Sequence, residues 1–200
     1  MRNAKTLQLF TGFAVLGSLI LAPQQAEAKK NENIADYGIT LGVSPFGGSF
    51  NFAKHQSHKT TYLVSIGGLP EFESNPTFND VSYTANNTST WAGFFVNHRP
   101  IKGAHWFRLN AGLAVGSIDG ELENDATGDV TTFSYNENPA VYTGIGFGGG
   151  AKKGFVIGGD IGLLTNSGAE LDGKDENELS KLWQFGSRLP NVQVILGYNF

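Results

Sequence analysis

The chain contains no cysteine, so neither a disulfide framework nor a thiolate metal site can form. The same absence excludes a lipoprotein anchor, because that lipid is attached to a cysteine. After the first 28 residues, no apolar run reaches the roughly 20 residues that a membrane-spanning helix needs. Nucleic-acid binding requires clustered Lys and Arg, and nothing in the charge balance suggests it. If the chain enters a membrane, it does so as strands.

The start of the chain has the order of a secretory signal. Arg2 and Lys5 form a basic start, residues 7–22 are mostly apolar, and Ala26-Glu27-Ala28 places small residues where a signal peptidase reads. We expect residues 1–28 to be a signal peptide cleaved after Ala28. Residues 29–200 then form one domain. Cleavage removes two basic residues and one acidic residue, so the formal net charge changes from −4 to −5.

The C-terminal segment alternates with the period of a transmembrane β-strand. Every second side chain from Val192 to Phe200 is apolar, and the positions between them include Gln193 and Asn199. Such strands present one apolar face to lipid and a small or polar face to the lumen. A strand of a soluble sandwich can alternate in the same way. A terminal aromatic such as Phe200, however, is the usual end of a bacterial outer-membrane barrel.

Seven upstream segments repeat this alternation. An even number of strands is what bacterial barrels require, and a closed sheet gives every backbone N–H and C=O in lipid a partner. The sequence therefore predicts an all-β fold, an eight-stranded antiparallel up-and-down transmembrane β-barrel. On the fifth strand, Trp106, Arg108 and Asn110 are expected opposite the lipid-facing side chains. The upstream strands are expected at residues 37–44, 49–53, 61–67, 92–97, 106–115, 141–148 and 155–163.

The connections alternate in length, as they do in barrels with short periplasmic turns and longer outer loops. Residues 56–59, 101–104 and 150–154 are short, whereas 70–89, 117–138 and 166–189 are expected to be long loops. The first outer connection, residues 44–47, is a tight exception. Residues 176–185 fit a short amphipathic helix, with Leu179, Leu182 and Trp183 on one side, or the start of the final strand.

Charged and titratable side chains follow the same division. Most carboxylates fall in the long loops, where we favour simple solubility over attraction of cations to the outer mouth. The four histidines lie in or beside the short turns and are interpreted as solvated. They are His55, His58, His98 and His105.

Several motifs of barrel construction follow one another along the chain. They are Pro100-Ile101-Lys102-Gly103 leading into residues 107–113, then residues 142–148 and 154–163, Leu189-Pro190, and the terminal Tyr198-Asn199-Phe200. By these motifs the chain resembles the small eight-stranded outer-membrane proteins grouped with the ornithine-uptake, carbapenem-susceptibility porin. The stretch after Gly112 departs from that family, because it lacks an aromatic-Asn pair before the loop.

The resemblance implies an outer-membrane barrel with passive passage of small zwitterionic or cationic solutes. The expected partners are outer-membrane lipid and lipopolysaccharide, and the barrel-assembly machinery through Phe200. The motifs carry no chemistry. We therefore expect no cofactor.

Two charges fall on lumen-facing positions of regular strands, Arg108 and Asp160. The strand between them presents glycines at 144, 146 and 148, so the long Arg side chain can reach the carboxylate. We expect a lumenal ion pair with Asn110 as a neighbour, because an unpaired charge is costly where water is excluded. The favoured role is a plug, since eight strands leave an interior that side chains nearly fill. A solute-binding site is the alternative.

Enzymatic activity is not expected. Barrel enzymes with a Ser, His and acidic triad need the base within hydrogen-bond reach of the nucleophile, and every histidine here falls at the end opposite the outer mouth. His55 and His58 could bind a metal, but two ligands without a carboxylate make a weak site. Three functions remain open: a narrow porin-like passage, a non-conducting structural or surface barrel that presents loops to partners, and a soluble periplasmic barrel.

Overall fold

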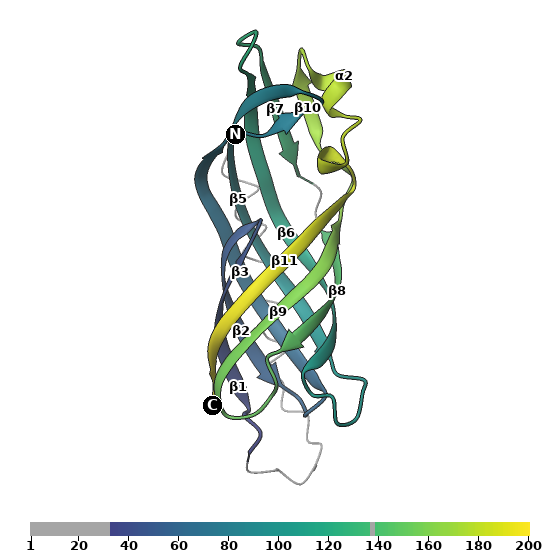
Figure 1. Ribbon diagram of the computed structural model, residues 1–200. Helices are drawn as coiled ribbons and strands as arrows, with labels where there is room; N and C mark the ends of the chain where they lie inside the picture. The colour runs from purple at the N-terminus through teal and green to yellow at the C-terminus, as the bar shows by residue number, and fades with distance from the viewer. Residues whose placement is uncertain (1–32, 137–138) are drawn as a thin grey trace, which may run out of the picture.

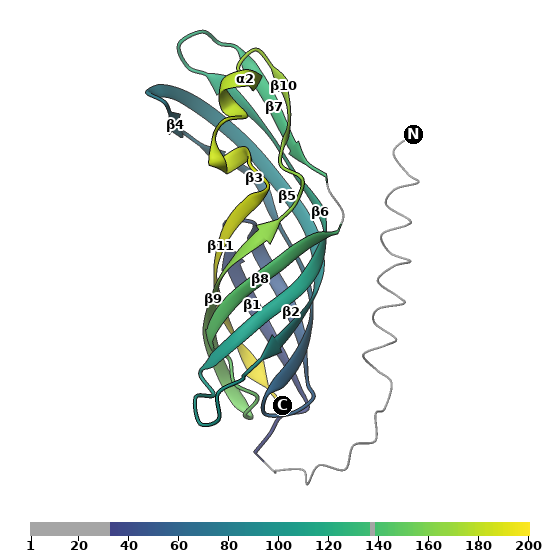
Figure 2. The same ribbon diagram turned by 90° about the vertical axis from the view of Figure 1, so that its right-hand side faces the viewer.

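The computed structural model describes residues 33–136 and 139–200. The predicted signal peptide and its cleavage after Ala28 lie outside these residues. Within them, eight strands form a ring in which each strand pairs antiparallel with its neighbours (Figures 1 and 2). The predicted eight-stranded barrel is confirmed. Its strands are β1 (Tyr37–Ser44), β2 (Gly47–His55), β3 (Thr60–Ser74), β5 (Val81–His98), β6 (Phe107–Asn124), β8 (Ala140–Gly148), β9 (Gly154–Thr165) and β11 (Arg188–Asn199).

The first and last strands close the ring. β1 pairs with β11 from Gly38↔Asn199 to Val43↔Val194. The last residue is part of this closure, because the backbone N–H groups of Asp36 and Tyr37 donate to the carbonyl of Phe200 at 3.0 and 3.1 Å. The end of the barrel that carries Phe200 is called the Phe200 end below.

The outward faces carry the apolar side chains that the alternation predicts. Exposed fractions reach 91% at Phe155, 72% at Ile157 and 70% at Val43, values that would be costly in water for so many neighbouring large residues. The inward faces instead hold buried polar residues such as Asn51 and Ser65. This distribution is the inverse of a soluble protein and fits a barrel in lipid. None of the helices in the described ranges is long and apolar enough to cross a membrane.

Aromatic rings gather at the Phe200 end. Tyr37 stacks on Phe52 and lies 6.4 Å from the Phe200 ring. Trp106, expected on the lumen side, is instead 59% exposed and stacks on the lipid-facing Phe147. The expectation was wrong because Trp106 precedes the first residue of β6, so the alternation of inward and outward side chains along β6 does not determine where Trp106 points. The rings are placed like the aromatic girdle that flanks the apolar band of outer-membrane barrels.

Three barrel strands run much further than their lipid-facing parts. β3, β5 and β6 have 15, 18 and 18 residues, and two of the expected long loops are largely strand. Residues 70–74 extend β3, 81–89 extend β5, and 117–124 extend β6. Residues 81–89 and 117–124 alternate as well, but their outward positions are polar, for example Thr84 and Glu121, whereas residues 70–73 are all exposed. The search for lipid-facing strands therefore passed over them.

These extensions carry a separate lobe at the opposite end of the barrel (Figure 2). The lobe comprises residues 70–74 of β3, 81–89 of β5 and 117–124 of β6, together with β4 (Thr77–Phe78), β7 (Val130–Tyr135), β10 (Glu170–Gly173), α2 (Glu176–Leu179) and the 3-10 turn η1 (Trp183–Phe185). Its own apolar core is formed by Tyr83, Ala85, Leu122, Leu179 and Phe185.

Residues 176–185 form α2 and η1, and the final strand begins only at Arg188. Leu179 is buried to 1% exposure, whereas Trp183 is 63% exposed and does not share its face. Asp175, just before α2, accepts hydrogen bonds from the Tyr83 hydroxyl at 3.1 Å and from Asn124 Nδ2 at 3.0 Å. These bonds attach the helical segment to β5 and β6.

Candidate functional site

The candidate site is the barrel lumen, and strand parity decides which side chains reach it. On β6 the even-numbered residues point inward, so that Arg108 and Asn110 are 1% and 5% exposed. Asp160 on β9 is 9% exposed. The register places Arg108 opposite Gly146 of β8, and Gly146 opposite Asp160. The three positions therefore form one row across three neighbouring strands.

The structure brings all three predicted lumen residues together. Arg108 Nη2 lies 3.0 and 2.9 Å from the two carboxylate oxygens of Asp160. Asn110 Nδ2 donates to Oδ1 of the same carboxylate. Arg108 Nη1 also donates to the carbonyl of Gly148 at 2.7 Å. The charge is thus held by a carboxylate and by backbone, as a buried guanidinium requires.

Gly146 makes this arrangement possible. A Cβ at this position would overlap both the Asp160 carboxylate and the Arg108 side chain. The guanidinium can therefore lie across bare backbone to reach the next strand. A Cβ at Gly144 would instead meet the Ile161 carbonyl and the Tyr142 hydroxyl.

A second buried cation, Arg99, was missed by the sequence reasoning. It is 1% exposed and donates from Nε to the His105 carbonyl at 3.2 Å and from Nη1 to Thr61 Oγ1 at 3.4 Å. Nη2 donates to the Gly149 carbonyl. Burial, and then the charge of Arg108, lower the pKa of Arg99 to about 10, so it stays protonated at neutral pH. The sequence does contain a signal for Arg99. The side chains of Phe95 and Asn97 on β5 point inward, and Arg99 is the next residue when every second position is counted.

His55 is also placed differently from the prediction. It was interpreted as a solvated turn residue, but it is 9% exposed and its Nδ1 lies 2.9 Å from Thr61 Oγ1. His55 also follows the alternation of its strand, because the side chains of Ser49 and Asn51 on β2 point inward and His55 has the same parity. The other three histidines are exposed. No group of three or more metal-ligating side chains occurs in the described part of the chain.

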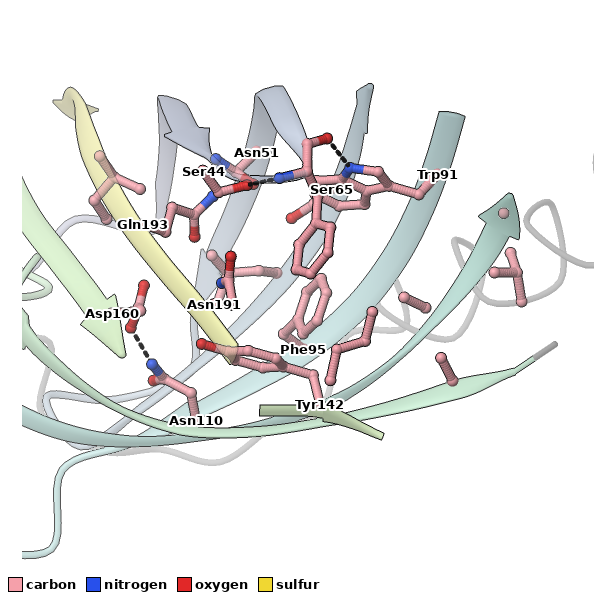
Figure 3. Close-up of a pocket in the computed structure, with 18 of the residues that line it drawn as sticks. Ser44, Asn51, Ser65, Trp91, Phe95, Asn110, Tyr142, Asp160, Asn191 and Gln193 are labelled. Carbon is pink, nitrogen blue, oxygen red and sulfur yellow. Dashed lines mark hydrogen bonds between the residues drawn. The ribbon is translucent and has the colours of Figure 1, made fainter. Parts of the chain in front are cut away.

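A cavity of about 120 Å³ occupies the lumen above the ion pair (Figure 3). Arg108, Asn110 and Asp160 line it on the side of the Phe200 end, and Ile118 and Tyr135 line it towards the lobe. At roughly 10–15 Å³ per water molecule, such a space holds on the order of ten waters. Below it, Arg99 and the turn at residues 149–151 fill the barrel, and Ala35 donates to the Ala151 carbonyl at 2.9 Å.

The two sides of this cavity differ in chemistry. On β1, β2 and β11 the lining is hydrogen-bonded amide and hydroxyl: Asn51 Nδ2 donates to Thr40 Oγ1 at 3.1 Å, and Gln193 Nε2 donates to Ser49 Oγ at 3.0 Å. On β5 and β8 it is aromatic, with Phe95 and Tyr142 edge to face at 5.7 Å (Figure 3). The lumen therefore offers a polar wall facing an apolar one.

No protein-family profile matches the chain, and no curated protein sequence does. Solved structures do match. CarO of Acinetobacter baumannii superposes with a TM-score of 0.64 at 15% identity, covering 84% of this chain and 98% of that one. CarO2 of the same organism gives 0.62 at 13%, covering 84% and 99%. Ail, the attachment invasion locus protein of Yersinia pestis, gives 0.40 at 11%, covering 82% and 93%.

The chain has the fold of a small eight-stranded outer-membrane barrel. In this fold the lobe extends one side of the wall, and its acidic residues can now be placed. An open groove of about 860 Å³ on the lobe is lined by Glu71, Asp119, Glu121, Glu170 and Asp172. The odd-numbered residues of β6 face away from the lumen, so this acidic surface flanks the barrel and does not line its mouth. Attraction of cations to the outer mouth, the alternative considered from the sequence, stays a prediction.

Proposed function

We propose that the protein resides in the bacterial outer membrane and passes small zwitterionic solutes through its lumen, with the Arg108–Asp160 pair as the barrier. The proposal rests mainly on one observation: a partly polar cavity extends from the lobe end to a buried ion pair in the lumen. With the Phe200 end in the periplasm, the lobe projects outward among lipopolysaccharide. Outer-membrane lipid and the assembly machinery, through Phe200, complete the proposed surroundings.

Charge at the barrier refines the expected solutes. Arg99 and Arg108 place two guanidinium groups there against the single carboxylate of Asp160. A bare cation meets net positive charge at this point, which costs free energy in a medium of low dielectric constant. A zwitterion can offer its carboxylate to the arginines and its ammonium group to Asp160. Zwitterions are therefore favoured over the cationic solutes that the resemblance also implies.

Reconstitution into planar bilayers tests the proposal. Wild-type protein should give rare, small current steps, because the ion pair, together with Arg99 and residues 149–151 below it, fills the lumen. The Arg108→Ala/Asp160→Ala double variant should widen the upper part of this barrier and give larger or more frequent steps. Liposome swelling should show the same order for glycine and other small zwitterions. Arg188→Ala is the matched control, since it removes a charge from the exposed outer end of β11 and should leave conductance unchanged.

A non-conducting barrel that displays its lobe is the competing function. The lobe has its own apolar core and an acidic groove, which a mere loop would not need. Folded protein that shows neither current steps nor swelling, in wild type and double variant alike, would contradict passage and favour display.

A further inference from the structure

The β1–β2 hairpin is too short to complete the barrel wall. β1 last pairs with β11 at Val43↔Val194, and β2 last pairs with β3 at Gly48↔Gly68. Beyond these points β11 pairs with β9 alone and β3 pairs with β5 alone. A wall gap therefore lies above the hairpin tip, residues 44–47, between residues 188–193 of β11 and residues 69–74 of β3. Figure 1 shows the hairpin ending well below both neighbours.

The height of the hairpin tip places this wall gap in the hydrocarbon layer. With about 3.4 Å per residue and a tilt near 40°, β1 rises roughly 15 Å between Tyr37 and Val43. The outward apolar band of such barrels is about 25 Å tall. On β11, apolar side chains continue beyond the last β1 pair, and Val192 is 56% exposed. The tip itself is Pro45-Phe46 and carries no charge, whereas the other lobe-end connections contain carboxylates.

Lumen side chains satisfy two of the backbone groups near the tip of the short hairpin, the Phe46 carbonyl and the Leu69 N–H. Ser89 Oγ donates to the Phe46 carbonyl at 2.9 Å and accepts from the Leu69 N–H at 3.0 Å. Trp91 Nε1 donates to the same carbonyl at 3.2 Å. Because lipid cannot supply such partners, a strand edge in hydrocarbon needs them from within the protein. The tip is thereby tied towards β5, and residues 188–193 of β11 form the edge that has no β1 partner.

Behind the wall gap lies the lumen cavity. Ser44 and Phe46 of the tip line it, as do Asn191 and Gln193 of β11. Its other side is apolar and is lined by Trp91, Phe95, Ile118 and Leu164. Benzene fits a cavity of about 150 Å³, so about 120 Å³ has room for a short stretch of alkyl chain, which would displace water from the apolar side.

We propose that the wall gap admits one alkyl chain of an outer-leaflet lipid into the lumen cavity. The alkyl chain packs against the aromatic side of the cavity. It stops at the Arg108–Asp160 pair, because entering further would desolvate the two charges. Phospholipid or lipid A can supply the same hydrocarbon. The proposal needs an open wall at membrane height and does not require solutes to cross the barrier.

Trp91 serves as the reporter, because its indole lines the cavity. In a protein with Trp106→Phe and Trp183→Phe it is the one remaining tryptophan. The protein is reconstituted into phosphatidylcholine vesicles whose acyl chains carry bromine, which quenches indole fluorescence on close approach. A second protein that retains only Trp106, exposed on the lipid side, calibrates full contact with the chains.

A matched pair of variants on β6 separates entry of a chain from quenching through the wall. Ala114→Phe fills the cavity, whereas Ala111→Phe adds the same ring to the exposed outer face. Quenching of Trp91 should persist in Ala111→Phe and fall about threefold in Ala114→Phe, because the space for the chain is occupied. Equal quenching in the two variants would overturn the proposal. Heat-dependent gel mobility verifies folding, and Ala140→Leu replaces Ala114→Phe if that variant does not fold.

A second quenching experiment identifies the source of the alkyl chain. Brominated dodecanoate is added to vesicles of ordinary phosphatidylcholine that contain the same reporter. Entry from the leaflet is supported if brominated phospholipid quenches Trp91 fluorescence at least as strongly as the added brominated dodecanoate does. Quenching by the fatty acid alone would assign the site to free amphiphiles and contradict the lipid source.

Discussion

At the scale of single residues, the site follows from the alternation of inward and outward side chains along each strand. At the end of β5 this alternation continues one residue into the turn, to Arg99, whereas before β6 it does not extend to Trp106. Arg108 and Asp160 were predictable from the alternation, because both lie inside regular strands. Arg99 and His55 obey it too, at or just past the ends of β5 and β2. His55 was assigned to solvent because short turns usually are solvated, and Arg99 was missed. Only the closed lumen shows that these turns fold across it.

The buried ion pair allows a double-mutant cycle. Removing one partner of a buried pair typically costs about 3–5 kcal/mol, because the other charge is left uncompensated. We expect Asp160→Ala to be the more damaging change, since it leaves Arg108 and Arg99 together without a carboxylate. Arg108→Ala leaves Asp160 with its bond from Asn110. The double variant should cost less than the sum of the two, as measured by urea unfolding in vesicles; strict additivity would show that the pair is not coupled.

At the scale of elements, β6 shows how one strand serves two environments. Its first half alternates lipid with lumen, and its second half alternates water with the core of the lobe, with no change in parity. The outward residues change from Leu109 and Leu113 to Glu121 and Glu123. A pattern search tuned to lipid-facing strands ends where this change occurs. The backbone pairing continues because the pairing does not depend on what faces outward.

The helical segment of the lobe should depend on one buried side chain. α2 has only four residues and cannot be stable alone, so Leu179, at 1% exposure, supplies its packing. Leu179→Ala should cost about 2–5 kcal/mol locally, which corresponds to a more than tenfold faster cleavage by trypsin at Lys181. Trp183→Ala, an exposed change of similar kind, should leave the cleavage rate near wild type. The barrel itself should keep its heat-dependent gel mobility in both variants.

High pH should loosen the same lobe. The Tyr135 hydroxyl donates to the Gln184 carbonyl at 2.5 Å, and burial raises the pKa of Tyr135 from 10.0 to about 12. Because the folded lobe favours the neutral phenol, this contribution is fully present below pH 10 and is lost as the pH rises towards 12. Trp183 fluorescence, in a Trp91→Phe/Trp106→Phe background, should report the change. In Tyr135→Phe the transition should be absent; an unchanged profile would assign it to other groups.

At the scale of the whole molecule, the closed ring links the last residue to the first strand. The Phe200 carbonyl accepts from two backbone N–H groups, while its ring is 52% exposed. Phe200→Ala keeps the carbonyl and removes only the ring. If the assembly machinery reads Phe200, as we propose, this change should give several-fold less assembled protein in cells but normal refolding into vesicles. Phe155→Ala, another exposed aromatic at this end, is the control; equal losses would point to membrane anchoring instead.

Alternation along the chain was enough to predict eight strands, their lipid faces, their antiparallel order and the Arg108–Asp160 pair. It was enough because successive residues of a barrel strand face lipid and lumen in turn, so that apolar residues alternate with small or polar ones. The lobe, the inward-folded turns and the short wall above the β1–β2 hairpin were decided by tertiary structure. They depend on how many residues each strand extends beyond its neighbours. They also depend on which distant side chains, such as Ser89 and Trp91, form hydrogen bonds with backbone groups that lack a strand partner. Those relations join residues far apart in the chain, and local periodicity carries no information about them.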